Sequence, residues 1–207
     1  MRLAKRVGPA VALPLAIAAC GGGSTSTSTT TKGPGNVNEQ PSKAANGQLT
    51  FSAPGMAIHF QYPAQFRAVA LAPSRRTAGS TTRATHSAVA IGDYDLLIVS
   101  RYPGLRYPVT ARNIGAVKPQ FDAVISRVLG RKVRGTVGSV GGLPAIFWPR
   151  EPVVGLPVKA TVMIVNVFVG KDEYELQCQA TSAHLATIEA ACQEMLATLT
   201  TRRSSTS

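Results

Sequence analysis

Apolar and polar residues alternate along several segments of the chain, which is the pattern of strands with one buried face. Met56, Ile58, Phe60 and Tyr62 occupy every second position of one such segment. The segment 161–169 is the most strand-like of the chain, and Gly92-Asp93 separates two runs as a hairpin turn would. The pattern predicts strands at 48–53, 56–62, 66–72, 86–91, 94–100 and 173–180, and several more within 132–168.

Two segments change to a helical period. Phe121, Val124, Ile125, Val128 and Leu129 are spaced as one face of a helix, which we expect to begin near Pro119 and to end at Gly130. A last helix is predicted after Ser182, a suitable N-cap residue. Its inner face would carry Leu185, Ile188, Cys192, Met195, Leu196 and Leu199.

Runs of strands followed by helices predict an α+β fold, in which helices cover an antiparallel sheet. The chain has 207 residues, of which 44% are hydrophobic and 15% charged, enough for one core and too few charges for a disordered polyelectrolyte or a coiled coil. No run of 18 apolar residues is present. We therefore expect one globular domain over residues 48–199, followed by a polar tail over 200–207.

The first 19 residues have the layout of a secretory signal peptide. Arg2, Lys5 and Arg6 precede an apolar stretch from Val7 to Ala19. That stretch ends in Ile17-Ala18-Ala19-Cys20, which resembles the bacterial lipobox, and the resemblance implies that Cys20 is lipidated and becomes the first mature residue. The alternatives are an ordinary signal peptide with a chance cysteine, or a buried helix. Since stable attachment takes about two acyl chains, a diacylglyceryl group on Cys20 would hold the protein on a membrane.

Residues 20–47 have the composition of a tether. Ser24 to Thr31 contains only serine and threonine, and glycine, proline and asparagine are frequent up to Gly47. Such a segment cannot bury enough apolar surface to offset its ordering entropy. A flexible chain of this length reaches about 30 Å. Ser24 to Thr31 could alternatively carry sugars.

The two remaining cysteines predict a disulfide bond. Strand alternation places Cys178 on the same side as Tyr174 and Leu176, and helical spacing places Cys192 on the inner face of the last helix. An exported protein lies in an oxidising compartment, which favours pairing over two free thiols. A metal site would have to recruit His184, but a single histidine at this spacing matches no zinc pattern.

The sequence offers little for catalysis. No Gly-x-Ser-x-Gly motif is present, and His59, His86 and His184 lie in or beside predicted elements without an obvious partner. The carboxylates form two groups, which we interpret as solvated hairpin ends, and the glycine-rich segment 135–142 matches no phosphate-binding motif. These two groups are Asp93 with Asp95, and Asp172 with Glu173 and Glu175. We expect no enzyme activity and no cofactor.

Charge is the remaining signal. The formal net charge is +12, and without the three basic residues of the signal peptide 19 basic and 10 acidic residues remain. Arg75, Arg76 and Arg83 lie in a polar segment over 73–85, where they could bind an anionic partner. Export separates the protein from nucleic acid, so anionic lipid headgroups, acidic envelope polymers or an envelope protein are the partners considered. Arginine richness could equally reflect composition alone.

Two segments resemble the PsbP-like superfamily, which includes small actinobacterial lipoproteins. They are Met56-Ala57-Ile58-His59-Phe60-Gln61-Tyr62-Pro63 with Phe66, and Tyr174 to Cys178 with Cys192 to Leu196. The resemblance implies an α/β/α sandwich around an antiparallel sheet and a binding or assembly role without catalysis, and it carries over no site residues. Fifteen arginines against seven lysines also indicate a GC-rich genome.

The sequence therefore predicts a lipoprotein on the outer face of the cytoplasmic membrane, with a non-catalytic binding or assembly domain in the cell envelope. One alternative is a carrier of lipid or another small ligand, with a cavity lined by Phe147, Trp148 or Phe168. The other is an envelope hydrolase, which would require Asp93 or Asp95 to meet a histidine.

Overall fold

A computed structural model describes residues 47–71 and 84–201 of the chain. The predicted signal peptide, Cys20, most of the tether and the arginines at 75, 76 and 83 lie outside these residues. Within the described residues, no helix is both long and apolar enough to cross a membrane.

The described residues form ten strands and two helices. In chain order they are β1 (Gln48–Phe51), β2 (Ile58–Pro63), β3 (Arg67–Val69), β4 (Thr85–Ala90), β5 (Leu96–Tyr102), α1 (Ile114–Val128), β6 (Thr136–Val140), β7 (Leu143–Pro152), β8 (Ala160–Val169), β9 (Asp172–Thr181), α2 (Leu185–Thr198) and β10 (Thr200–Thr201). Every pairing between strands is antiparallel. The α+β class and the antiparallel sheet are confirmed.

Seven strands form the main sheet in the order β3-β4-β5-β9-β8-β7-β6, and β1, β2 and β10 form a smaller sheet. The turn between β6 and β7 consists of Gly141 and Gly142, both at positive φ. A side chain at Gly141 would also collide with the carbonyl oxygen of Leu199, only 2.4 Å from the position of a Cβ. The glycine-rich segment is thus a strand and a hairpin turn that only glycine fits closely.

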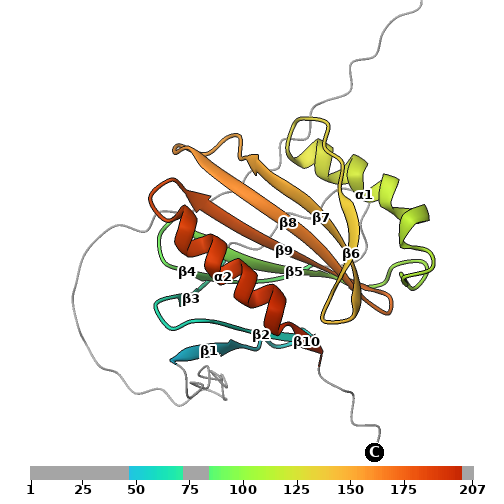
Figure 1. Ribbon diagram of the computed structural model, residues 1–207, viewed down its shortest axis with the longest axis horizontal. Helices are drawn as coiled ribbons and strands as arrows, with labels where there is room; N and C mark the ends of the chain where they lie inside the picture. Colours follow the sequence, from blue (N-terminus) through green and yellow to red (C-terminus); the bar gives the residue numbers. More distant parts are fainter. Residues whose placement is uncertain (1–46, 72–83, 202–207) are drawn as a thin grey trace, which may run out of the picture.

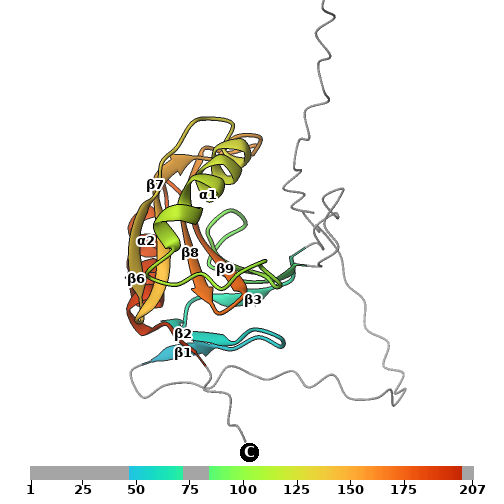
Figure 2. The same cartoon turned by 90° about the vertical axis from the view of Figure 1, so that its right-hand side faces the viewer.

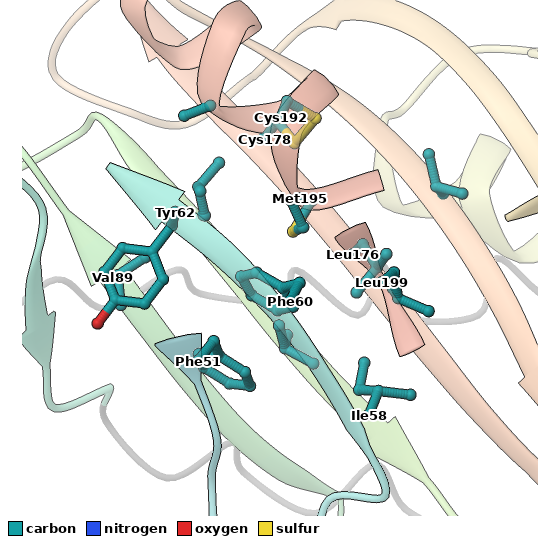
Figure 3. Close-up of a cluster of buried hydrophobic side chains, with 14 of the residues drawn as sticks. Phe51, Ile58, Phe60, Tyr62, Val89, Leu176, Cys178, Cys192, Met195 and Leu199 are labelled. Atoms are coloured by element: carbon teal, nitrogen blue, oxygen red, sulfur yellow. A yellow bond between two sulfur atoms is a disulfide. The ribbon is translucent and has the colours of Figure 1, made fainter. Parts of the chain in front are cut away.

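The two helices lie on opposite faces of the main sheet (Figures 1 and 2). Alternation along each strand divides its side chains between an α2 face and an α1 face. On the α2 face, α2 and β2 pack together over a large apolar cluster that includes Phe60, Leu176 and Met195 (Figure 3). On the α1 face, a second cluster joins Ile125 of α1 to Trp148 and Phe168 of the sheet.

The helix α1 begins earlier than predicted. It starts at Ile114 and contains Pro119 in its sixth position. Proline there lacks the N–H that would bond to the carbonyl of Gly115, which usually marks a helix start. Ile114 and Val117 nevertheless extend the apolar face toward the sheet, and their packing outweighs the lost bond.

Two other boundaries differ from the sequence prediction. The residue before α2 is His184, not Ser182, and it makes no side-chain capping bond. Thr200 and Thr201, which the polar composition assigns to the tail, pair with His59 and Ile58 of β2 as strand β10. This short strand fixes the end of α2 to the small sheet.

Candidate functional site

Polar side chains cross the α1 face of the main sheet in register. His86 on β4 lies opposite Ser100 on β5, Ser100 lies opposite Glu175 on β9, and Glu175 lies opposite Asn166 on β8. Two residues further along β5, Tyr102 lies opposite Glu173 of β9. Gln177, two residues after Glu175 on β9, faces the same way. We call this set the polar strip: His86, Ser100, Tyr102, Asn166, Glu173, Glu175 and Gln177.

Hydrogen bonds connect the members of the strip within and between strands. Asn166 Nδ2 donates to Glu173 Oε1 at 2.5 Å, and Gln177 Nε2 donates to Glu175 Oε1 at 2.6 Å. On the other side, His86 Nδ1 and Ser100 Oγ lie 2.8 Å apart. Both amide groups thus direct their N–H groups toward carboxylates, and these bonds hold the two glutamate side chains in place.

The two glutamates share an environment that disfavours their charged forms. Burial, reinforced by the neighbouring Glu175, raises the pKa of Glu173 to about 8, although the bond from Asn166 acts in the opposite direction. Burial also raises the pKa of Glu175, against the bond from Gln177. The solvent-accessible surface of both residues is intermediate, so the strip is partly reachable from solvent. At neutral pH the pair holds a proton that two exposed glutamates would have lost.

The aromatic members of the strip respond to the same environment. Burial raises the pKa of Tyr102, with Glu175 and Glu173 acting in the same direction, so its hydroxyl stays protonated. Burial lowers the pKa of His86, whose ring packs edge-on against Tyr102 with 6.2 Å between centroids. The imidazole is therefore neutral at pH 7.

Asn166 has an acceptor without a partner. Its residue is 1% exposed, and within the part of the chain that the structure describes its Oδ1 is the buried side-chain atom that has no hydrogen bond. A buried amide oxygen without a donor costs about 1–3 kcal/mol. The strip therefore combines carboxyl oxygens with an amide oxygen that lacks a donor.

The polar strip was missed in the sequence, where Asp172, Glu173 and Glu175 were interpreted as solvated hairpin ends. That interpretation is wrong for Glu173 and Glu175, which face the partly buried strip, whereas Asp172 pairs with Arg101 at 2.8 Å. The available signal was Asn166, a polar residue in the middle of the apolar run 161–169. Among the described residues, no group of three histidine, cysteine or acidic side chains could hold a metal ion.

The predicted disulfide bond between Cys178 and Cys192 is present. It joins β9 to α2 with 6.1 Å between the Cα atoms, and both residues are at most 1% exposed (Figure 3). It lies on the α2 face, away from the polar strip. Its role is to fasten the last helix to the sheet.

Asp95 meets His184, as the hydrolase alternative requires. Asp95 Oδ2 lies 2.9 Å from His184 Nδ1, while Oδ1 accepts hydrogen bonds from the backbone N–H and the hydroxyl of Thr181. Among the described residues, no hydroxyl or thiol is hydrogen-bonded to the His184 ring. The contacts instead connect the β4–β5 turn to the start of α2, and no nucleophile is placed for this pair to activate.

The three aromatic residues named for a carrier cavity do not line one space. Trp148 and Phe168 are each 1% exposed in the α1-face core, where Trp148 Nε1 donates to Asp122 and Phe168 packs edge-on against Phe121. Phe147 packs against the α2-face cluster on the other side of the sheet. Neighbouring residues of one strand face opposite ways, so Phe147 and Trp148 belong to different cores, and the carrier alternative receives no support from these three side chains.

Basic residues gather at the C-terminal end of α1. Arg127, Arg131, Lys132 and Arg134 are all exposed there, and Arg131 pairs with Glu151 at 2.8 Å. The end of a helix also favours positive charge, so part of this cluster stabilises α1 itself.

No family model and no curated protein matches the chain. Several solved structures resemble it, among them three with low sequence identity. A protein from Bacteroides thetaiotaomicron has a TM-score of 0.48 and 13% identity, with 75% of this chain and 48% of that one covered. LpqN of Mycobacterium tuberculosis, described as involved in cell envelope biogenesis, has a TM-score of 0.44 and 14% identity, covering 72% and 85%. The cyanobacterial PsbP of Synechocystis has a TM-score of 0.47 and 10% identity, covering 81% and 99%.

The chain spans about half of the Bacteroides protein. The structure defines an α+β domain in which one face of the main sheet is covered by a large apolar cluster and the other face carries a polar strip.

Proposed function

We propose that this protein is an exported lipoprotein, attached through Cys20 to the outer face of the cytoplasmic membrane, whose domain binds a ligand on the polar strip without transforming it. The observation that carries the binding role is the in-register row of His86, Ser100, Glu175 and Asn166. Four neighbouring strands of one sheet hold these side chains, so the site is organised before a ligand arrives.

A binding role fits the strip better than a purely structural one. A polar row inside a sheet face is costly unless its groups are satisfied, and Asn166 Oδ1 lacks a donor. The adjacent apolar side chains of Ala88, Ala90, Leu96 and Ile98 show that the same face can be filled by hydrophobic packing. The retained polar groups are therefore explained if they meet a ligand.

Besides the pair of Asp95 and His184, the contact between Ser100 and His86 favours the hydrolase alternative. A serine beside a neutral histidine is the beginning of a nucleophilic site. Ser100 is only 2% exposed, however, and the carboxylate opposite it lies on the serine side, not behind the histidine. A non-catalytic role for this pair therefore fits the geometry better than a triad does.

The export and anchoring part of the proposal is tested by labelling cells with a palmitate analogue. The wild-type chain should take up label and remain with the membrane fraction. Cys20→Ser should lose both, whereas Cys178→Ser, a matched change of a different cysteine, should keep the label. Secretion of an unlabelled wild-type protein would contradict the lipoprotein proposal and leave the binding role to be judged separately.

The binding part is tested by native mass spectrometry. The purified chain is incubated with the small-molecule fraction of a bacterial envelope extract, desalted and weighed. We expect an adduct on the wild type that is absent from Glu173→Gln/Glu175→Gln. Glu194→Gln on α2, behind the opposite sheet face, is the matched control and should keep the adduct. An adduct retained by the double variant would place ligand binding elsewhere.

A fluorophosphonate probe separates binding from hydrolysis. It should leave the wild type unlabelled, because Ser100 is buried and not activated. Stoichiometric labelling that disappears in Ser100→Ala would establish the hydrolase alternative instead.

A further inference from the structure

We propose, building on the proposed binding role, that the ligand group recognised by the polar strip is a protonated primary amine held between the carboxyl groups of Glu173 and Glu175 and the amide oxygen of Asn166. Primary ammonium groups carry three N–H donors and no acceptor. The three residues offer oxygen atoms from two neighbouring strands.

The hydrogen-bond inventory of the strip favours a donor over an acceptor. The N–H groups of Asn166 and Gln177 are directed toward Glu173 and Glu175, so these donors already serve the carboxyl groups. Beyond these bonds, acceptors outnumber donors on the four residues. The acceptors are the second carboxyl oxygens and the two amide oxygens, and the donors are one further N–H of each amide and the proton that the glutamate pair retains until it is displaced. A ligand that brings only donors complements this set better than a phosphate or carboxylate, which brings only acceptors.

Asn166 supplies evidence that does not depend on the carboxylates. Its Oδ1 is buried without a partner although its Nδ2 is bonded, so the side chain is held in place with its acceptor unused. An N–H group of the ligand would satisfy this atom and remove the cost of leaving it alone. An isolated acidic cluster would offer no such fixed acceptor.

Spacing is suitable for one ammonium group. Residues two apart on a strand have Cα atoms about 7 Å apart and face the same way, and Glu173 and Glu175 have this relation. A nitrogen between them can approach both carboxyl groups at ordinary hydrogen-bond distance, since each side chain has three torsions. Because no third carboxylate, histidine or cysteine joins them in the described chain, a metal ion is less well served.

Proton release should accompany binding. The titratable groups along this face are Glu173, Glu175, Tyr102 and His86, and the two glutamates retain a proton at neutral pH because they are buried and because Glu175 lies beside Glu173. An arriving ammonium brings a positive charge to the pair, and the proton leaves the carboxyl group for the solvent. Affinity should therefore rise from pH 6 to pH 9, a range in which an alkylamine stays protonated.

Isothermal titration calorimetry with n-butylamine tests this inference, with n-butanol as the uncharged match. We expect one site for the amine and none for the alcohol, with an affinity at pH 8.5 at least tenfold higher than at pH 6. Titrations at pH 7.5 in phosphate and in HEPES, neither of which is a primary amine, should differ in enthalpy, because the released proton is taken up by the two buffers with different heats. Equal binding of the alcohol, or an affinity independent of pH, would overturn the inference.

Three variants localise the site. Glu173→Gln/Glu175→Gln should weaken butylamine at least tenfold, Glu194→Gln should leave it unchanged, and Gln177→Glu should strengthen it severalfold by adding negative charge to the strip. Trp148 fluorescence checks that each variant keeps its α1-face core. Because a gain of affinity cannot come from unfolding, the Gln177→Glu result stands even if the double variant folds poorly. The proposed site would be refuted if Gln177→Glu does not gain affinity for butylamine and the double variant binds it as the wild type does.

Two further probes separate possible sources of the amine. Nα-acetyl-lysine amide represents a lysine side chain of a protein, and vesicles containing phosphatidylethanolamine represent a lipid headgroup, with phosphatidylcholine vesicles as control. If none of the amines binds but the extract adduct persists on the wild type and not on the double variant, the amine inference fails while the binding role stands. If neither amine binding nor the extract adduct is observed, both the amine inference and the proposed binding role fail.

Discussion

The two faces of the main sheet are built on the same strands and differ in what covers them. On the α2 face, apolar side chains from β1, β2, α2 and six strands of the main sheet form one continuous cluster, with the disulfide bond inside it. On the α1 face, apolar packing is divided into two smaller clusters. Between them runs the polar strip. The comparison indicates that one continuous apolar core holds the α2 face, whereas on the α1 face polar side chains interrupt the apolar packing.

The largest expected effect is on the α2 face. Phe60 is 1% exposed and stacks on Phe51 with 4.5 Å between ring centroids (Figure 3). Phe60→Ala leaves a cavity that the surrounding sheet cannot close, so the free energy of unfolding should fall by about 3–5 kcal/mol. Urea unfolding followed by Trp148 fluorescence measures it. Tyr107→Ala, at a position 61% exposed, is the control and should change stability by less than about 0.5 kcal/mol.

Removing the disulfide bond should have the next largest effect. Cys178 and Cys192 are 14 residues apart, and closing a loop of that size stabilises the folded chain by about 3 kcal/mol in the chain-entropy account. Cys178→Ala/Cys192→Ala should lower the free energy of unfolding by about that amount. Unfolding of the wild type with and without reductant provides the same comparison without mutation. A change below about 0.5 kcal/mol in both would show that α2 is held by packing alone.

The attachment of α1 is predicted to depend on one carboxylate. Asp122 accepts hydrogen bonds from the backbone of Gly135 at 2.8 Å and from Trp148 Nε1 at 2.9 Å, and it pairs with Lys118. Burial acts to raise the pKa of Asp122, but these bonds together lower it. Asp122→Ala should cost about 1.5–3 kcal/mol, the range for hydrogen bonds to a charged group.

The pH dependence gives a second test of Asp122. A depressed folded-state pKa contributes stability that is present above the unfolded value and is lost as the pH falls through the folded value. The difference in stability between wild type and Asp122→Asn, from urea unfolding, should therefore narrow as the pH falls below about 4. If the difference in stability stays constant from pH 7 to pH 2.5, the shape of the Asp122 side chain, not its charge, explains its contribution to stability.

The sequence was sufficient for features that depend on local periodicity. Alternation along Met56 to Tyr62 located β2, and the inward positions of Cys178 and Cys192 led to the disulfide bond. The start of α1 was missed because Pro119 is a stronger local signal than the apolar spacing that precedes it. Here tertiary packing outweighed propensity.

The polar strip could not be located in the same way. Its members come from β4, β5, β8 and β9, and they become neighbours only through the strand order and register. Alternation did place Glu175 and Gln177 opposite the core, but it does not reveal whether that side faces solvent or a half-covered sheet face. Asn166 stands out in the sequence as a polar residue in an apolar run, but nothing in the sequence indicates that it bonds to Glu173.

The smallest expected effect lies on the α1 face and has the opposite sign. The pKa of Glu173 is raised to about 8, so the folded chain binds a proton more tightly than the unfolded chain does. Stability is therefore highest below the unfolded value, near pH 4.5, and falls as the pH rises toward 8 and the buried carboxyl group must ionise. Glu173→Gln removes the ionisation and keeps an oxygen for the bond from Asn166. Because Glu173 is partly exposed, solvent screening reduces the effect of this displacement, and we expect the equivalent of about one pKa unit, about 1.4 kcal/mol, by which the variant should be more stable than the wild type at pH 8.5. At pH 5 the two should unfold at the same urea concentration. A change in packing would act equally at both pH values. If Glu173→Gln is less stable than the wild type at both, Glu173 has a structural role, and the contrast between the two sheet faces is weakened.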